Sequence, residues 1–321
     1  GMTMTQKILA AHAGLDSVAL LSPCIPLIIA LVLIGANMPN VARGGKVTID
    51  FGGILLLTVA LCGVILGLNE GPKVGWGNIG VIAGLVIGII TTVLLFKYEA
   101  KVAEPIIPVN LLKNSKYTIL LLVGFLCYFY KCAMDTYAPL GLQKVFEAST
   151  TMSGSLQFPR TIVTMVVPII AGAWVAKKTA NLWKAMAIAT VLIAVSFGIM
   201  AVITAPGNPL MTGFAVYMAF ITITGISESL RAVAITPPAQ SYLEPKDYGT
   251  GTAMVNFVNS LANPFAAAFS GILYDIPTHN DTANVTLIAS GVRNVYLLAA
   301  ISGLVGFIIV IAVVRKHLAS R

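Results

Sequence analysis

Two pairs of oppositely charged residues lie inside stretches of sequence that are otherwise apolar. Lys131 and Asp135 are four residues apart, and Glu228 and Arg231 are three apart, so each pair shares one helical face. An ionisable side chain in a bilayer costs about 2.5–3.5 kcal/mol on insertion scales and usually marks a pathway or a neutralising pair. Asp135 could bind a cationic substrate or carry a proton. The alternative is a structural ion pair near the outer leaflet.

The second pair lies just before Thr236-Pro237-Pro238, toward the cytoplasmic end of its apolar stretch. That position favours a gate or an interface pair, Glu228 with Arg231, over a substrate site. Arg160 directly follows Pro159 in another apolar stretch, and we expect it only to anchor that stretch at headgroup level.

A third candidate is a row of amides. Asn256, Asn259 and Asn263 recur at i, i+3 and i+7, with Ser260 beside them and Pro264 next. Such a row either hydrogen-bonds a neighbouring helix, which is the commoner outcome, or lines a water-filled cavity. All three asparagines are therefore candidates for a substrate or proton pathway, and Pro264 predicts a kink.

These side chains must be positioned by membrane-spanning helices. A bilayer core about 30 Å thick needs roughly 20 helical residues, and nine apolar stretches are long enough. They are Val18–Gly35, Phe51–Leu68, Trp76–Phe96, Tyr117–Pro139, Ser153–Ala176, Leu182–Ile203, Leu210–Val233, Thr250–Tyr274 and Asn294–Val314. The prediction is an all-α polytopic membrane protein whose odd number of spans puts its two ends on opposite sides of the membrane.

Composition supports this class of protein. Hydrophobic residues make up 57% of the 321 residues and charged residues 10%, and the mean hydropathy is +0.90. A soluble domain carries about 25% charged residues. The sequence has no nucleophile elbow, phosphate-binding loop or metal-ligand spacing of Cys and His. We therefore expect no enzyme, no metal and no cofactor.

The net charge of +8 is a topology signal, because basic residues are retained on the cytoplasmic side. Thirteen basic residues fall in loops of one side, and four fall on the other (Lys7, Lys73, Lys144 and Arg293). The thirteen are Arg43, Lys46, Lys97, Lys101, Lys113, Lys116, Lys177, Lys178, Lys184, Lys246, Arg315, Lys316 and Arg321. This sorting predicts a cytoplasmic C-terminus and a multi-pass protein of the plasma membrane, with no nucleic-acid site.

The connections between the spans carry a family pattern. Asp50-Phe-Gly-Gly53 lies at the start of the second span, and a Gly/Pro turn leads to Trp76 at the start of the third. Glu99 then stands six residues before Pro105-Ile-Ile107. Further on come Pro139–Glu147 (PLGLQKVFE), Ser153–Pro159 (SGSLQFP), Gly172–Lys178 (GAWVAKK) and Pro237–Met254. Taken in order, these segments resemble the fourteen-span drug:proton antiporter branch of the major facilitator superfamily, although Ala176 replaces an Asp of its loop pattern.

The resemblance implies a specific organisation. Residues 1–17 would be an N-terminal segment, 18–116 the last helix of the first half plus two linker helices, and 117–321 the C-terminal six-helix bundle. The chain would then be the C-terminal portion of an antiporter, without the family's first five helices. It would be inactive by itself and would need the missing helices or a second copy of itself.

The implied function is proton-coupled efflux of hydrophobic or cationic small molecules, with the lipid bilayer, a small amphipathic substrate and protons as partners. Two alternatives stay open. One is a complete nine-span permease of another family, and the other is a non-transporting membrane assembly subunit.

Overall fold

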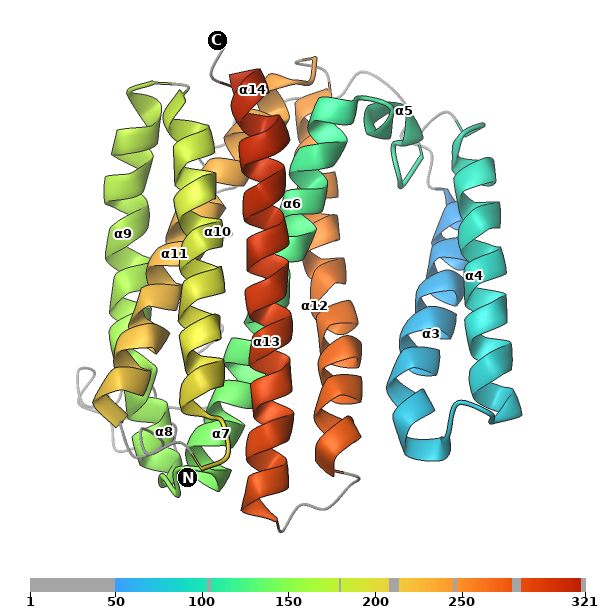
Figure 1. Cartoon of the computed structure of the whole chain (residues 1–321). Helices are drawn as coiled ribbons and strands as arrows, with labels where there is room; N and C mark the ends of the chain where they lie inside the picture. Colours follow the sequence, from blue (N-terminus) through green and yellow to red (C-terminus); the bar gives the residue numbers. More distant parts are fainter. Residues whose placement is uncertain are drawn as a thin grey trace, which may run out of the picture. The chain divides into compact units, whose positions relative to one another are not determined.

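The computed structural model describes residues 50–102, 105–178, 180–207, 214–244, 247–278 and 284–318 (Figure 1). Within these ranges all regular structure is helical, which confirms the predicted all-α class. The N-terminal segment 1–17 and the predicted span Val18–Gly35 lie outside the described residues.

The first two described spans form a helical hairpin, α3 (Phe51–Val74) and α4 (Ile79–Glu99). Asp50 begins α3 by accepting a hydrogen bond from the Gly53 amide, and Asn78 begins α4 by accepting one from Gly80. Both helices run beyond the predicted ends Leu68 and Phe96, because hydropathy alone does not mark where helical hydrogen bonding stops.

Glycine allows α3 and α4 to approach closely. A Cβ added to Gly88 would lie 2.6 Å from the backbone nitrogen of Val64 and 3.0 Å from the carbonyl carbon of Gly63. Neither atom can move without shifting the helix. The contact is therefore backbone against backbone, which is typical of helix pairs in membranes.

The segment after α4 is held by Glu99, which is 2% exposed. Its carboxylate accepts a hydrogen bond of 3.3 Å from the Ile107 amide. One residue earlier, the Tyr98 hydroxyl donates to Asp50 at the start of α3. The spacing of Glu99 from the Pro105–Ile107 turn thus has a physical reason, since the glutamate closes this loop. The short α5 (Val109–Leu112) follows.

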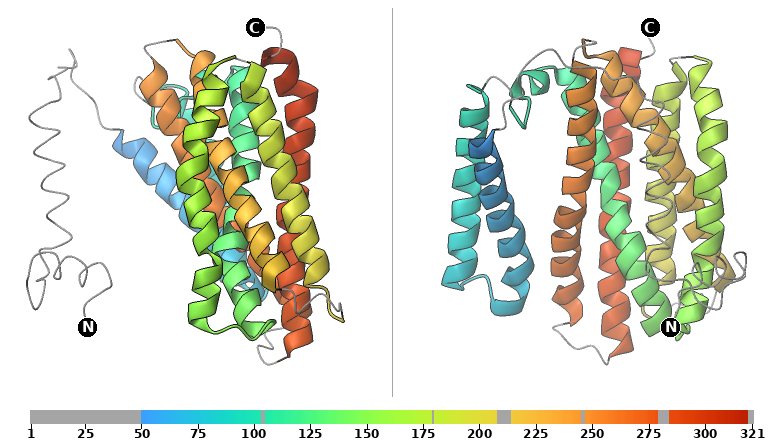
Figure 2. Two further views of the ribbon diagram at one scale, coloured as in Figure 1. Left: turned by 90° about the vertical axis from the view of Figure 1, so that its left-hand side faces the viewer. Right: turned by 180° about the vertical axis from the view of Figure 1, so that it is seen from behind.

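The described helices that follow α5 pack into a bundle (Figures 1 and 2). The first is α6 (Ser115–Cys132), continued by the π-helical turn η1 (Ala133–Tyr137) and by α7 (Ala138–Lys144). The others are α8 (Thr150–Leu156) with α9 (Phe158–Ala176), α10 (Ala180–Ile203), α11 (Phe214–Ser241), α12 (Tyr248–Thr278), and α13 (Val285–Ile309) with η4 (Val310–Val314) and α14 (Arg315–Leu318).

Two predicted boundaries were wrong by eight residues or more. The seventh span does not end at Val233, because α11 continues through Pro237 and Pro238 to Ser241. Prolines are tolerated in spanning helices where neighbouring elements satisfy the freed backbone groups. The ninth span does not begin at Asn294. Asn284 accepts hydrogen bonds from the Thr286 and Leu287 amides and so starts α13 nine residues earlier.

Seven of the described helices are long and apolar enough to cross a membrane. The predicted span Thr250–Tyr274 forms a helix, α12, but this helix is not among the seven. It is long enough at 31 residues. Its three asparagines lower its hydropathy. The same asparagines make α12 a candidate pathway helix and make it harder to recognise as a membrane span from hydropathy.

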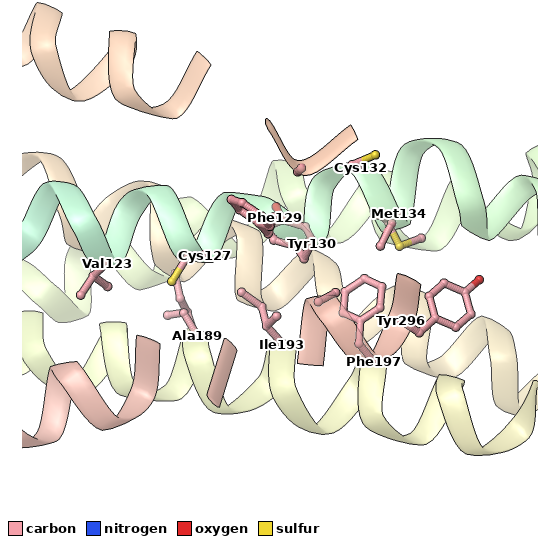
Figure 3. Close-up of a cluster of buried hydrophobic side chains, with 14 of the residues drawn as sticks. Val123, Cys127, Phe129, Tyr130, Cys132, Met134, Ala189, Ile193, Phe197 and Tyr296 are labelled. Carbon is pink, nitrogen blue, oxygen red and sulfur yellow. The ribbon is translucent and has the colours of Figure 1, made fainter. Parts of the chain in front are cut away.

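The core of this bundle includes α6, which contacts α10, α11, α12 and α13. Figure 3 shows side chains of α6 and η1 facing those of α10, with Tyr296 of α13 joining them. The labelled residues are Val123, Cys127, Phe129, Tyr130, Cys132, Met134, Ala189, Ile193, Phe197 and Tyr296. By contrast, Met165, Ile169 and Ile170 of α9 are at least 64% exposed, as expected for a helix face in contact with lipid.

The described basic connections gather at one end of the helices. In Figure 1 the segment around α5, the turn between α9 and α10, and the end of α14 lie at the top, and the α3–α4 and α7–α8 turns lie at the bottom. Lys97, Lys113, Lys177 and Arg315 therefore belong to one end, whereas Lys144 belongs to the other. This agrees with the predicted alternation of the loops.

Candidate functional site

Four charged side chains from α6, η1, α9 and α11 form a closed ring of ion pairs. Lys131 Nζ lies 3.2 Å from Asp135 Oδ2 and 3.8 Å from Glu228 Oε1. Arg160 closes the ring, with Nη2 donating to Glu228 Oε2 at 2.7 Å and Nη1 lying 3.6 Å from Asp135 Oδ1. Each charge has two partners of opposite sign, so the ring is electrically neutral.

The ring lies deep within the spans. Each member stands at least nine residues from either end of its candidate span (Ser115–Lys144, Thr150–Ala176 or Ala215–Gln240). At 1.5 Å per residue this is about 13 Å or more of helix between each ring residue and the ends of its span. Arg160 therefore does more than anchor α9, which was the expectation from the sequence, because it pairs with two carboxylates.

Exposure differs around the ring. The side chains of Arg160, Glu228 and Lys131 are 14%, 23% and 29% exposed, whereas that of Asp135 is 45% exposed. Asp135 also lies in the π-helical turn η1, an irregularity that is frequent at functional sites. Asp135 is thus the carboxylate of the ring that an incoming cation or proton could reach most readily.

The predicted pairing of Glu228 with Arg231 is wrong, whereas that of Lys131 with Asp135 is confirmed. Glu228 faces Arg160 and Lys131 instead. Arg231 is 8% exposed, and its guanidinium lies over the Tyr128 ring at 4.8 Å from the centroid. Among the described residues no carboxylate lies within ion-pair distance of Arg231, and its Nε has no hydrogen-bond partner there.

Arg231 lines a cavity of about 340 Å³ between α6, α11 and α12. Most of the lining is polar, and it consists of Tyr128, Arg231, Ala232, Ile235, Thr236, Asn256, Asn259 and Ser260. Two of the three predicted asparagines are therefore brought to one cavity. Asn263 is exposed and does not line it. Asn259 also packs over Gly124, where an added Cβ would lie 3.3 Å from its amide oxygen.

Sequence reasoning missed the role of Arg160, and a count of charges could have revealed it. The predicted spans Tyr117–Pro139, Ser153–Ala176 and Leu210–Val233 together hold three cations (Lys131, Arg160 and Arg231) but only two anions (Asp135 and Glu228). Pairing by sequence proximity assigns the anions to Lys131 and Arg231. A bundle pairs charges by depth and face instead, which is how Arg160 takes the place of Arg231.

No family model matches the sequence. The chain is, however, 26% identical over 257 residues to the multidrug transporter protein MdtP of Bacillus subtilis, a match of 79% of this chain and 46% of that protein. It is 26% identical over 235 residues to the MFS-type transporter of the acurin A biosynthesis cluster of Aspergillus aculeatus, covering 71% and 40% of the two chains. It is 24% identical over 256 residues to the efflux pump FUS6 of Gibberella fujikuroi, covering 76% and 44%.

These relatives are named as a multidrug transporter, an MFS-type transporter and an efflux pump. With the seven apolar helices, they identify a multi-pass membrane protein and support the prediction of a transporter over an enzyme. The MFS type of the Aspergillus aculeatus relative agrees with the resemblance found in the loops and with a partial major facilitator fold. The matched region is less than half of the length of each of these three relatives.

Proposed function

We propose that this chain is the C-terminal portion of a proton-coupled efflux transporter of the fourteen-span major facilitator branch. On this proposal α3 and α4 are the linker helices, and the spans from Ser115 to Val314 form the second six-helix half. The basic loops and the C-terminus face the cytoplasm of a plasma membrane. The relatives named as efflux pumps and the ordered loop motifs support this organisation.

The observation that carries the proposal is the ion-pair ring in the middle of three spans. A neutral ring of four charges loses a counter-charge when either carboxylate is protonated. Protonation of Asp135 would leave Lys131 and Arg160 sharing Glu228, with one uncompensated positive charge deep in the membrane. Binding of a cationic molecule at Asp135 would compete with that proton. Competition of this kind couples proton entry to drug release.

A half transporter has no enclosed pathway, because the family's pathway runs between two halves. The proposal therefore assigns the missing part to further helices. A fusion would test this, in which the part of MdtP that the match does not cover is joined ahead of residue 18 and expressed in bacteria deficient in efflux. Ethidium should accumulate less in these cells than in cells that express either part alone.

The pH gradient supplies the second readout of this experiment. A protonophore should abolish the difference in ethidium accumulation if protons drive export. Equal accumulation in all strains, with the fusion present in the membrane fraction, would contradict the proposed function. Export by the 321-residue chain alone would instead favour a complete permease.

A further inference from the structure

We propose that the cavity at Arg231 binds the carboxylate of a small organic anion, and that this is a substrate subsite of the transporter. The assignment as a substrate subsite rests on the function proposed above, whereas the binding of a carboxylate does not. It extends the expected substrates from cations to molecules that carry an anionic group.

Arg231 carries a positive charge that no carboxylate of the described residues balances. The ring of Lys131, Asp135, Arg160 and Glu228 is neutral by itself, so it supplies no spare carboxylate. Arg231 is 8% exposed and has no carboxylate partner among the described residues. A buried charge without a counter-ion is costly, and a buried guanidinium is therefore expected to take an anion from elsewhere.

The Arg231 guanidinium is held against an aromatic ring. Tyr128 lies under it at 4.8 Å, and stacking of this kind fixes the plane of the guanidinium. A fixed guanidinium presents its N–H groups as a fork that matches the two oxygens of a carboxylate. The Nε atom is buried and has no hydrogen-bond partner among the described residues, so no protein acceptor holds this edge of the guanidinium.

Polar side chains line the cavity together with Arg231. Asn256, Asn259 and Ser260 of α12 and Thr236 of α11 face the same space as Arg231. Amide and hydroxyl groups can donate the further hydrogen bonds that a desolvated carboxylate needs. The volume of about 340 Å³ admits a small aromatic acid, and it lies at the lower end of ligand pockets in general.

The test measures equilibrium binding of radiolabelled benzoate to the purified 321-residue chain in lipid nanodiscs. Benzyl alcohol and benzylammonium serve as matched neutral and cationic probes. Benzoate should bind measurably and more tightly than either. Arg231→Gln should weaken benzoate binding by about thirtyfold or more, and Arg231→Lys by less, because lysine keeps the charge but loses the fork. Arg293→Gln, an exposed arginine of α13 outside the cavity, should leave binding unchanged.

A second variant covers the case in which Arg231→Gln does not fold. Asn256 is exposed, so Asn256→Leu should fold, and it should weaken benzoate binding several-fold. The proposal would be overturned if benzoate bound no more tightly than benzyl alcohol. It would also be overturned if the Arg231→Gln and Asn256→Leu variants bound benzoate as tightly as the unaltered chain.

A final comparison distinguishes two possible ligands of Arg231, a free organic anion and a carboxylate side chain of the added helices. If the chain alone binds benzoate but the MdtP fusion does not, a side chain of the added helices occupies the site and the substrate assignment falls. Because this assay measures binding and not export, its failure leaves the proposed efflux function standing, and failed export leaves the binding result standing.

Discussion

The Arg160 guanidinium of α9 donates to the Glu228 carboxylate of α11 across 2.7 Å, although 68 residues separate them in the sequence. This contact joins two helices that also pack along their length. It brings the Arg160 charge beside the i,i+4 pair of Lys131 and Asp135, and so converts a local pair into a four-membered ring. The ring is thus a product of tertiary packing.

Removing Arg160, the least exposed member of the ring, should destabilise the bundle. Arg160→Gln leaves Glu228 and Asp135 with Lys131 as their shared partner, and because the pair is part-buried the loss should be smaller than the roughly 3–5 kcal/mol of a fully buried pair. Arg160→Gln/Glu228→Gln should recover most of that loss, because it removes one charge of each sign. Thermal unfolding in detergent would measure both. A double variant no more stable than Arg160→Gln would show that the ion pair itself is not what stabilises α9 against α11.

Asp135 should be needed for export and not for folding. In the MdtP fusion, Asp135→Asn should abolish resistance to cationic dyes while the amount of protein in the membrane stays the same, since the asparagine keeps the shape but cannot exchange a proton. Growth on ethidium and immunoblots of membranes would measure the two quantities. If Lys131→Met/Asp135→Met supported both expression and resistance, the carboxylate would have no role in coupling.

The sorting of basic residues predicts which loops face the cytoplasm. In a background without Cys24, Cys62, Cys127 and Cys132, a single cysteine at Lys113 should resist an impermeant maleimide in intact cells and react after the cells are opened. A cysteine at Lys144, at the other end of the helices, should react in intact cells. The reverse pattern of labelling would invert the topology.

Close packing of the α3–α4 hairpin should depend on Gly88 more than on Gly84. A Cβ at position 88 meets backbone atoms at 2.6 Å, whereas a Cβ at position 84 lies 3.5 Å from the Gly63 carbonyl oxygen, an ordinary contact. Gly88→Ala should therefore lower the unfolding free energy by about 1–3 kcal/mol, and Gly84→Ala should have little effect. Equal effects of the two variants in urea or thermal unfolding would argue against this helix contact.

Much of the fold could be predicted from the sequence, because the hydropathy of a spanning helix is a property of consecutive residues. The pair of Lys131 and Asp135 could also be predicted, since helical geometry alone brings i and i+4 together. The partner of Glu228 could not, because it depends on how α9 and α11 are rotated against each other. The start of α13 could have been predicted only by recognising Asn284 as an N-cap. Hydropathy does not identify caps, because a cap is a polar residue outside the apolar stretch.

The central claim is that this chain supplies one half of a transport pathway. Proteoliposomes with an imposed pH gradient test it most directly, with ethidium transport followed by fluorescence. The purified 321-residue chain should transport no more dye than protein-free liposomes, and the MdtP fusion should transport dye in a manner that collapses with the gradient. Gradient-driven dye transport by the 321-residue chain alone would contradict the claim.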